Sequence, residues 1–236
     1  MHEFALYSQI PATRHDQVLQ ILAGVTASQP TATLEQTLIY QQARLADTGN
    51  SKKVPTGRQT AAQTQRLCYH KLVRDLKRPE GEKGLWTFRA EDVPLPGVQS
   101  MISRPAIEQI VGEAELERFR QGNGWYKYIN QCVASPGYRF VHNNVVIRIS
   151  RILSVPEGTG ALEALDAPVP TLSDCKPVDP SGTYYFEACV RVEDGGNSKI
   201  VEHATTELMA FKKQVEGAID LPVPERLALD TRVKGT

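Results

Sequence analysis

The sequence predicts a mainly β protein of the α+β class, an antiparallel β-barrel with two or three flanking helices. Short segments of alternating apolar and polar residues recur along the chain, the pattern of strands that bury one face. Turn-forming residues separate several of these segments, so neighbouring strands should pair antiparallel. An exposed sheet edge favours aggregation, which closure prevents. We therefore expect about eight strands closed into a barrel.

The first half of the chain contains five predicted strands. In His2 to Ile10, Phe4 and Leu6 alternate with Glu3 and Tyr7, as in a half-buried strand. The other four are Thr33 to Leu45, Arg66 to Leu76, Leu85 to Glu91 and Val98 to Ile110. The last of these contains Pro105, which favours a sheet edge or a bulge and leaves irregular structure as an alternative.

The block Trp125 to Val155 predicts three consecutive strands joined by tight turns. The turns are Ser135-Pro136-Gly137 and His142-Asn143-Asn144, which supply the residues that hairpins need. A further strand runs from Thr183 to Glu193, with Tyr184, Phe186, Ala188, Val190 and Val192 on one face. The opposite face carries Tyr185, Glu187, Cys189, Arg191 and Glu193, and we interpret it as a stripe that faces solvent.

Three segments have helical spacing. After Pro11, Thr13 is a candidate N-cap for a helix that carries apolar residues at i, i+3, i+4 and i+7 and ends near Gly24 or Pro30. Glu113 to Arg120 predicts a short helix on the surface. The third helix places Ala204, Leu208, Phe211 and Val215 on one side.

The expected domain organisation is one β-barrel domain over residues 1–220, followed by a C-terminal tail over 221–236. Residues from about 46 to 65 are almost free of large apolar side chains, and we expect a mobile loop there. Residues from about 156 to 182 form a proline-rich loop for which we expect no regular structure.

Composition excludes several function classes. The 27 Lys and Arg residues balance the 27 Asp and Glu residues, so no positive field attracts nucleic acid, and we expect no direct nucleic-acid partner. No apolar run approaches the about 20 residues of a membrane span, so we expect no membrane partner. The four cysteines are isolated, which favours reduced, structural thiols.

No arrangement of residues predicts catalysis, and we expect no catalytic, cofactor-binding or metal-binding residues and no cofactor. The five histidines show no zinc-ligand spacing, and no serine or cysteine lies in a nucleophile motif. Gly122-Asn123-Gly124 follows a helix and lacks the lysine of a phosphate-binding loop. Arg148 and Arg151 fall on opposite faces of one strand. Arg151, on the apolar side, could pair with an acid inside the protein or at a partner interface, and we favour a structural ion pair.

Three blocks of the sequence resemble subunit 18 of the fungal Mediator complex. The first is His2 to Pro11 with Arg14 to Gly24, and the second is Tyr126 through Gly137-Tyr138-Arg139-Phe140 to Val146–Leu153. The third comprises Tyr185-Phe186-Glu187-Ala188 and the last helix. Together these blocks cover more than half of the chain.

The resemblance implies a barrel related in shape to the triphosphate tunnel metalloenzymes, but without their chemistry. Their Glu-x-Glu-x-Lys signature is absent here, since Glu187-Ala188-Cys189-Val190-Arg191 lacks the second acid. The resemblance also implies a nuclear, non-catalytic subunit that scaffolds the Mediator head module and relays regulatory signals to the RNA polymerase II pre-initiation machinery. The implied partners are Mediator subunit 20, as a heterodimer, the C-terminal helix of subunit 8, and other head-module subunits.

The alternative is a divalent-metal-dependent tunnel phosphohydrolase acting on RNA 5′-triphosphate or polyphosphate. At least four carboxylates that converge inside the barrel would favour this enzyme, whereas an apolar or filled interior would exclude it.

Overall fold

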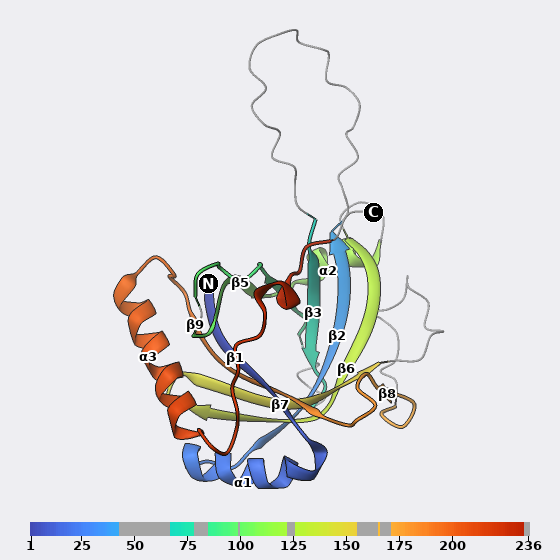
Figure 1. Cartoon of the computed structure of the whole chain (residues 1–236). Coiled ribbons are helices and arrows are strands. Elements are labelled where there is room, and N and C mark those ends of the chain that lie inside the picture. The colour runs from blue at the N-terminus through green and yellow to red at the C-terminus, as the bar shows by residue number, and fades with distance from the viewer. Residues whose placement is uncertain are drawn as a thin grey trace, which may run out of the picture.

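The computed structural model describes residues 1–42, 67–77, 85–98, 100–121, 126–154, 165 and 171–233. Eight antiparallel strands are hydrogen-bonded in the order β6-β2-β3-β4-β5-β1-β9-β7, and pairing of β7 with β6 closes the ring (Figure 1). The strands are β1 (His2–Ile10), β2 (Thr31–Gln42), β3 (Tyr69–Asp75), β4 (Thr87–Glu91), β5 (Ile102–Ile110), β6 (Tyr126–His142), β7 (Val145–Ser154) and β9 (Tyr184–Val192). The predicted antiparallel barrel is confirmed.

Three helices flank the barrel, as predicted: α1 (His15–Thr26), α2 (Glu113–Arg120) and α3 (Ser198–Gln214). Two of them differ in detail from the sequence-based expectation. Thr13 does not cap α1, because it lies in a short 3-10 turn (Ala12–Arg14) that precedes the helix. Helix α3 begins earlier than its apolar spacing suggests, because the Asn197 side chain accepts hydrogen bonds from the backbone N–H groups of Lys199 and Ile200.

The predicted turn at Ser135-Pro136-Gly137 is wrong. Strand β6 continues through this segment, and a register shift between Ser135 and Tyr138 marks a bulge in its pairing with β7. The strand is kept extended because β2 pairs with it on one side and β7 on the other, so local turn chemistry is overridden. The second predicted turn is confirmed, with Asn143 in the left-handed region at φ 53°.

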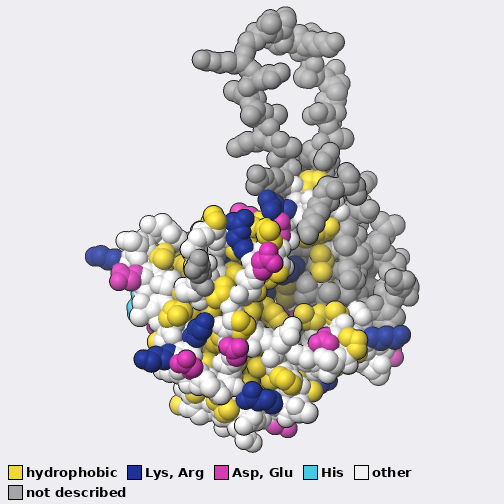
Figure 2. Space-filling view, in the orientation of Figure 1, with side chains coloured by type: hydrophobic (Ala, Val, Ile, Leu, Met, Phe, Trp, Pro, Cys, Tyr) yellow, Lys and Arg dark blue, Asp and Glu magenta, His cyan; other side chains and the backbone are white. Residues whose placement is uncertain are grey.

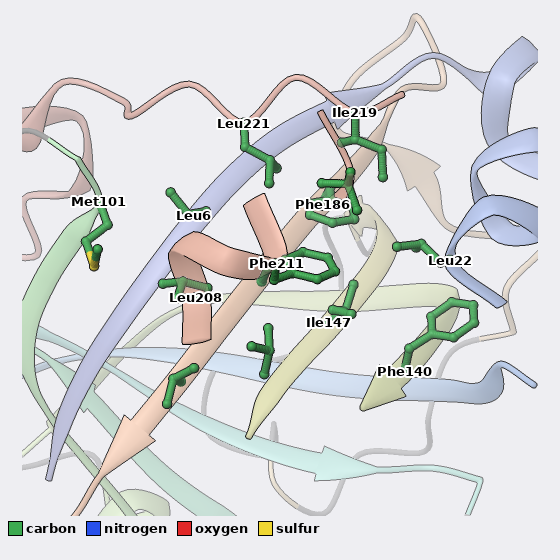
Figure 3. Packing of buried hydrophobic residues seen from close by; sticks show 14 of the residues in the cluster. Leu6, Leu22, Met101, Phe140, Ile147, Phe186, Leu208, Phe211, Ile219 and Leu221 are labelled. Carbon is green, nitrogen blue, oxygen red and sulfur yellow. The ribbon is translucent and has the colours of Figure 1, made fainter. Parts of the chain in front are cut away.

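The main hydrophobic core lies outside the barrel wall, between the sheet and helices α1 and α3 (Figure 3). Phe186 of β9, Ile147 of β7 and Leu6 of β1 point toward Leu208 and Phe211 of α3. A second cluster packs Leu116 and Phe119 of α2 against Leu38, Tyr40, Leu72 and Trp86. Because the outward strand faces bury these apolar side chains, the opposite faces are directed into the barrel.

Residues after α3 lie along the barrel, as the red trace in Figure 1 shows. Leu221 is buried in the main core, and the Ser8 hydroxyl donates to the carbonyl of Asp220. Further on, the Thr231 hydroxyl donates to the carbonyl of Glu91. The backbones of Cys68 and Arg232 pair as an isolated antiparallel β-bridge. The described part of the tail therefore contacts β1, β4 and the start of β3.

The predicted loop at about 46–65 lies outside the described residues. The proline-rich segment 156–182 is described only in part, and there the expectation of no regular structure is wrong at one place. Strand β8 (Lys176–Pro177) pairs with the end of β7, and the N–H of Val178 donates to the carbonyl of Ile152. Among the described helices, none is long and apolar enough to span a membrane.

Candidate functional site

The barrel interior carries most of the buried charge that the structure describes. Period-two alternation directs every second residue of β1, β3, β4, β5, β7 and β9 inward. The interior charged residues are Glu3, Lys71, Arg89, Glu91, Arg104, Glu108, Arg148, Glu187 and Arg191, and ion pairs join them across neighbouring strands. The face of β9 that contains Glu187, Cys189 and Arg191 belongs to this interior, so its interpretation as a solvent-facing stripe is wrong.

Glu3 is the centre of the network and is 0% exposed. Arg104 donates to one of its carboxylate oxygens from Nε (2.9 Å) and Nη2 (2.7 Å), and Arg191 donates to the other oxygen from Nε (2.8 Å). Burial alone would raise the pKa of Glu3, but the charges of Arg104 and Arg191 outweigh it and hold the pKa below its ordinary value. Glu3 is therefore an ionised carboxylate with both oxygens occupied by guanidinium groups.

Glu91 is the second buried carboxylate of the network. Its Oε2 lies 2.9 Å from Lys71 Nζ and 3.4 Å from Arg104 Nη1. Burial again acts to raise the pKa, but the charges of Lys71 and Arg104 lower it to about 2. Arg104 thus joins the carboxylate of β1 to that of β4.

Two further interior acids are also paired. Glu108 of β5 pairs with Arg89 of β4 at 3.1 Å and with Arg191 of β9, whereas Glu187 pairs with Arg148 of β7 at 3.3 Å. The carboxylates of Glu3, Glu91, Glu108 and Glu187 are therefore each neutralised by at least one internal cation.

Three interior side chains stay neutral in these surroundings. Burial, followed by the charge of Glu187, raises the pKa of Cys189 to about 12. The same two causes, in the same order, raise the pKa of Tyr7 and of Tyr185 above the ordinary tyrosine value. The thiol and the two phenols therefore add no negative charge to the interior.

Glu3, Glu187 and Cys189 place their ligand atoms within 4.8 Å of one another, a spacing that could hold a metal ion. The chemistry of this set fits a cation poorly. Metal binding needs a thiolate and free carboxylate oxygens. Here the thiol is protonated and guanidinium groups occupy both oxygens of Glu3. An added cation would also lie beside Arg148, whose Nη1 is 4.0 Å from Cys189 Sγ.

At one mouth of the barrel the interior opens into a pocket of about 280 Å³. It is lined by charges of both signs, among them Glu35, Asp75, Arg89 and Arg139. On the outer surface, Figure 2 likewise shows basic and acidic groups interspersed, with no large patch of either sign on this face. Neither surface has the single-sign field that steers a polyanion.

Arg151 and His15 lie outside this interior network. Arg151 makes no ion pair in the described part of the chain, so the structural pair is not found there and pairing at a partner interface stays a prediction. Instead, its guanidinium lies over the Tyr184 ring, and its Nε donates to the carbonyl of Gly182. His15 is a packing histidine, buried and stacked on Tyr184. The glycine loop 122–124 lies outside the described residues.

Sequence reasoning missed the interior site because alternation shows that a strand has two faces without showing which face is enclosed. One signal was available. Glu3, Arg104 and Arg191 lie on three strands, each opposite an apolar face, and a barrel with helices outside must enclose the polar face.

Comparison with known proteins identifies the family. The family model for "Med18 protein" matches residues 2–232. Relatives named Mediator of RNA polymerase II transcription subunit 18 include one from Coccidioides immitis, 30% identical, and one from Aspergillus niger, 26% identical; each alignment covers 99% of this chain and all of the relative. A chain in the structure of the Schizosaccharomyces pombe Mediator head module is similar in fold, with a TM-score of 0.68 at 16% identity over 95% of this chain and 99% of that chain. The chain described here belongs to the Med18 family.

Proposed function

We propose that this chain is a non-catalytic subunit of the Mediator coactivator complex in the nucleus. In this role it scaffolds the head module and relays regulatory signals to RNA polymerase II at promoters. The observation that carries the proposal is the match of the Med18 family over nearly the whole chain. The fold shared with a chain of the Mediator head module supports the same assignment.

The interior chemistry supports a role in binding and not in turnover. Tunnel hydrolysis of a triphosphate needs carboxylates that are free to hold a divalent cation. In this barrel the criterion of four converging carboxylates is met in number, but Lys and Arg side chains already occupy the space beside them. An interior whose charges neutralise one another offers an incoming cation no net attraction.

Phosphate release from a 5′-triphosphate RNA oligonucleotide and from tripolyphosphate, with Mg²⁺ or Mn²⁺, tests this proposal. We expect no release above that of buffer. Release that disappears in a Glu3→Gln variant, but persists in a variant of the exposed residue that follows β9, Glu193→Gln, would establish the phosphohydrolase instead.

The proposed partners are Mediator subunit 20, as a heterodimer, and the C-terminal helix of subunit 8. The family resemblance supports these partners. No surface of this chain identifies them, because core and interface apolar faces look alike in a single chain. Co-expression with subunit 20 should yield a one-to-one complex by light scattering on a sizing column. A Phe186→Asp variant, which disrupts the core under α3, should abolish the complex, whereas Glu193→Gln should preserve it. A well-folded native chain that elutes alone would contradict the proposed pairing.

A further inference from the structure

A small pocket at the rim of the barrel contains a half-buried arginine that has no carboxylate partner among the described residues. The pocket has a volume of about 140 Å³ and lies where the end of β7, strand β8 and the start of β9 meet. Arg151 and Tyr184 line it, together with Ile152 and Val178. Arg151 lies on the opposite face of β7 from Arg148 and takes no part in the interior ion pairs, although Tyr185, from the inward face of β9, also lines this pocket.

The charge of Arg151 is not neutralised by the described part of the chain. Its guanidinium carbon lies 4.4 Å from the centre of the Tyr184 ring, and its Nε donates to the carbonyl of Gly182 at 3.1 Å. No described carboxylate lies within ion-pair distance of it, whereas Arg148 is paired with Glu187. The Nη groups of Arg151 carry four further N–H donors, and none has an acceptor among the described residues.

The guanidinium plane is held in place before any ligand arrives. His15 stacks on the same tyrosine ring at 4.0 Å, and two groups this close to one ring must lie on its opposite faces. Gly182, at φ 71°, lies directly against the guanidinium, since a Cβ there would be in van der Waals contact with Nη2 at 3.4 Å. A side chain fixed by stacking and a hydrogen bond loses little conformational entropy on binding.

The surroundings define the ligand. Asp179 is an acid that lines the pocket, but its Oδ1 accepts the backbone N–H of Ser181, so this carboxylate belongs to its own turn. Ile152 and Val178 are 43% and 57% exposed and form an apolar rim. Strand β8 contains Pro177, which has no N–H for strand addition, so recognition through side chains is favoured.

We propose that this pocket receives an aspartate or glutamate side chain from a partner protein, with an aliphatic neighbour of that acid covering Ile152 and Val178. The Nη groups of Arg151 donate to the incoming carboxylate. This proposal rests on the proposed scaffolding function in one respect: the partner protein that supplies the aspartate or glutamate would be another subunit of the assembly.

A titration of the isotopically labelled full chain with acetyl-Leu-Glu-Leu-amide tests the proposal. The NMR signal of Arg151 Nε–Hε should shift and saturate. The matched peptide with Gln in place of Glu should bind at least about tenfold more weakly, because the charge-assisted pair is lost. An Arg151→Gln variant should lose the saturable response, whereas Arg139→Gln, at an exposed arginine of β6, should retain it.

Equal binding of the Glu and Gln peptides, or no saturable shift, would overturn the proposal. Acetate that binds as tightly as the peptide would also overturn it, because the apolar rim would then contribute nothing. If Arg151→Gln does not fold, Arg151→Lys keeps the charge without the stacked plane, and it should bind the peptide several-fold more weakly. Native affinity in this variant would refute the role of the stacked guanidinium. Since the titration uses the chain alone, its failure leaves assembly with subunit 20 untouched.

Discussion

Replacing Glu3 by glutamine should be among the most destabilising single substitutions in this protein. The variant keeps the size of the side chain but leaves Arg104 and Arg191 without their shared carboxylate, and Arg104 is only 4% exposed. Removing one member of a buried ion pair costs about 3 to 5 kcal/mol when the remaining charge is uncompensated, and because Arg104 keeps Glu91 and Arg191 keeps Glu108, we expect a loss of about 3 kcal/mol. In a chain of this length each kcal/mol lowers Tm by about 2 to 4 °C. A fall in Tm of about 10 °C is therefore expected.

The assay is urea unfolding followed by circular dichroism, with Glu193→Gln as the matched control. Glu193 directly follows the strand that carries Arg191 but is exposed, so its replacement should change the free energy of unfolding by less than about 0.5 kcal/mol. If Glu3→Gln lowers the free energy of unfolding by less than about 1 kcal/mol, and the dependence of this free energy on urea concentration is unchanged, the reasoning is refuted. It would mean that water or a rearranged Glu108 compensates the two arginines.

Three further predictions concern Glu91, Gly137 and Asn197. The pKa of Glu91 falls from 4.5 to about 2 on folding, so ionised Glu91 contributes about 3 kcal/mol to the free energy of unfolding above pH 4.5, and this contribution is lost as the pH falls toward 2. The free energy of unfolding of Glu91→Gln should therefore fall less steeply on acid titration than that of the native chain. Gly137→Ala should lower Tm, because a Cβ would lie 2.8 Å from Thr33 Oγ1 and 3.1 Å from a backbone carbonyl, whereas Gly24→Ala, in open space on α1, should raise it. Asn197→Ala should cost about 1 kcal/mol in urea unfolding through the lost cap of α3.

The limits of sequence reasoning are clearest in β9. Alternation correctly separated Phe186 and Val190 from Glu187 and Arg191, because side-chain direction along a strand is a local property. Which face is enclosed depends on where helices far along the chain pack, and α3 begins only after β9 ends. The error at Ser135-Pro136-Gly137 has the same origin, since pairing with β2 and β7 decided the outcome there.

At strand β5 the interior ion pairs reinforce the pairing of neighbouring strands. Residues 102–105 of this strand pair with β1, and residues 106–110 pair with β4, so each neighbour is held over only part of the strand. Arg104 lies beside this change of partner and binds carboxylates of both neighbours, Glu3 of β1 and Glu91 of β4. The ion pairs thus connect strands at a point where each backbone ladder spans only part of β5. A catalytic cation site would need the same carboxylates unpaired, so joining the strands through Arg104 and holding a metal there are mutually exclusive uses of these acids.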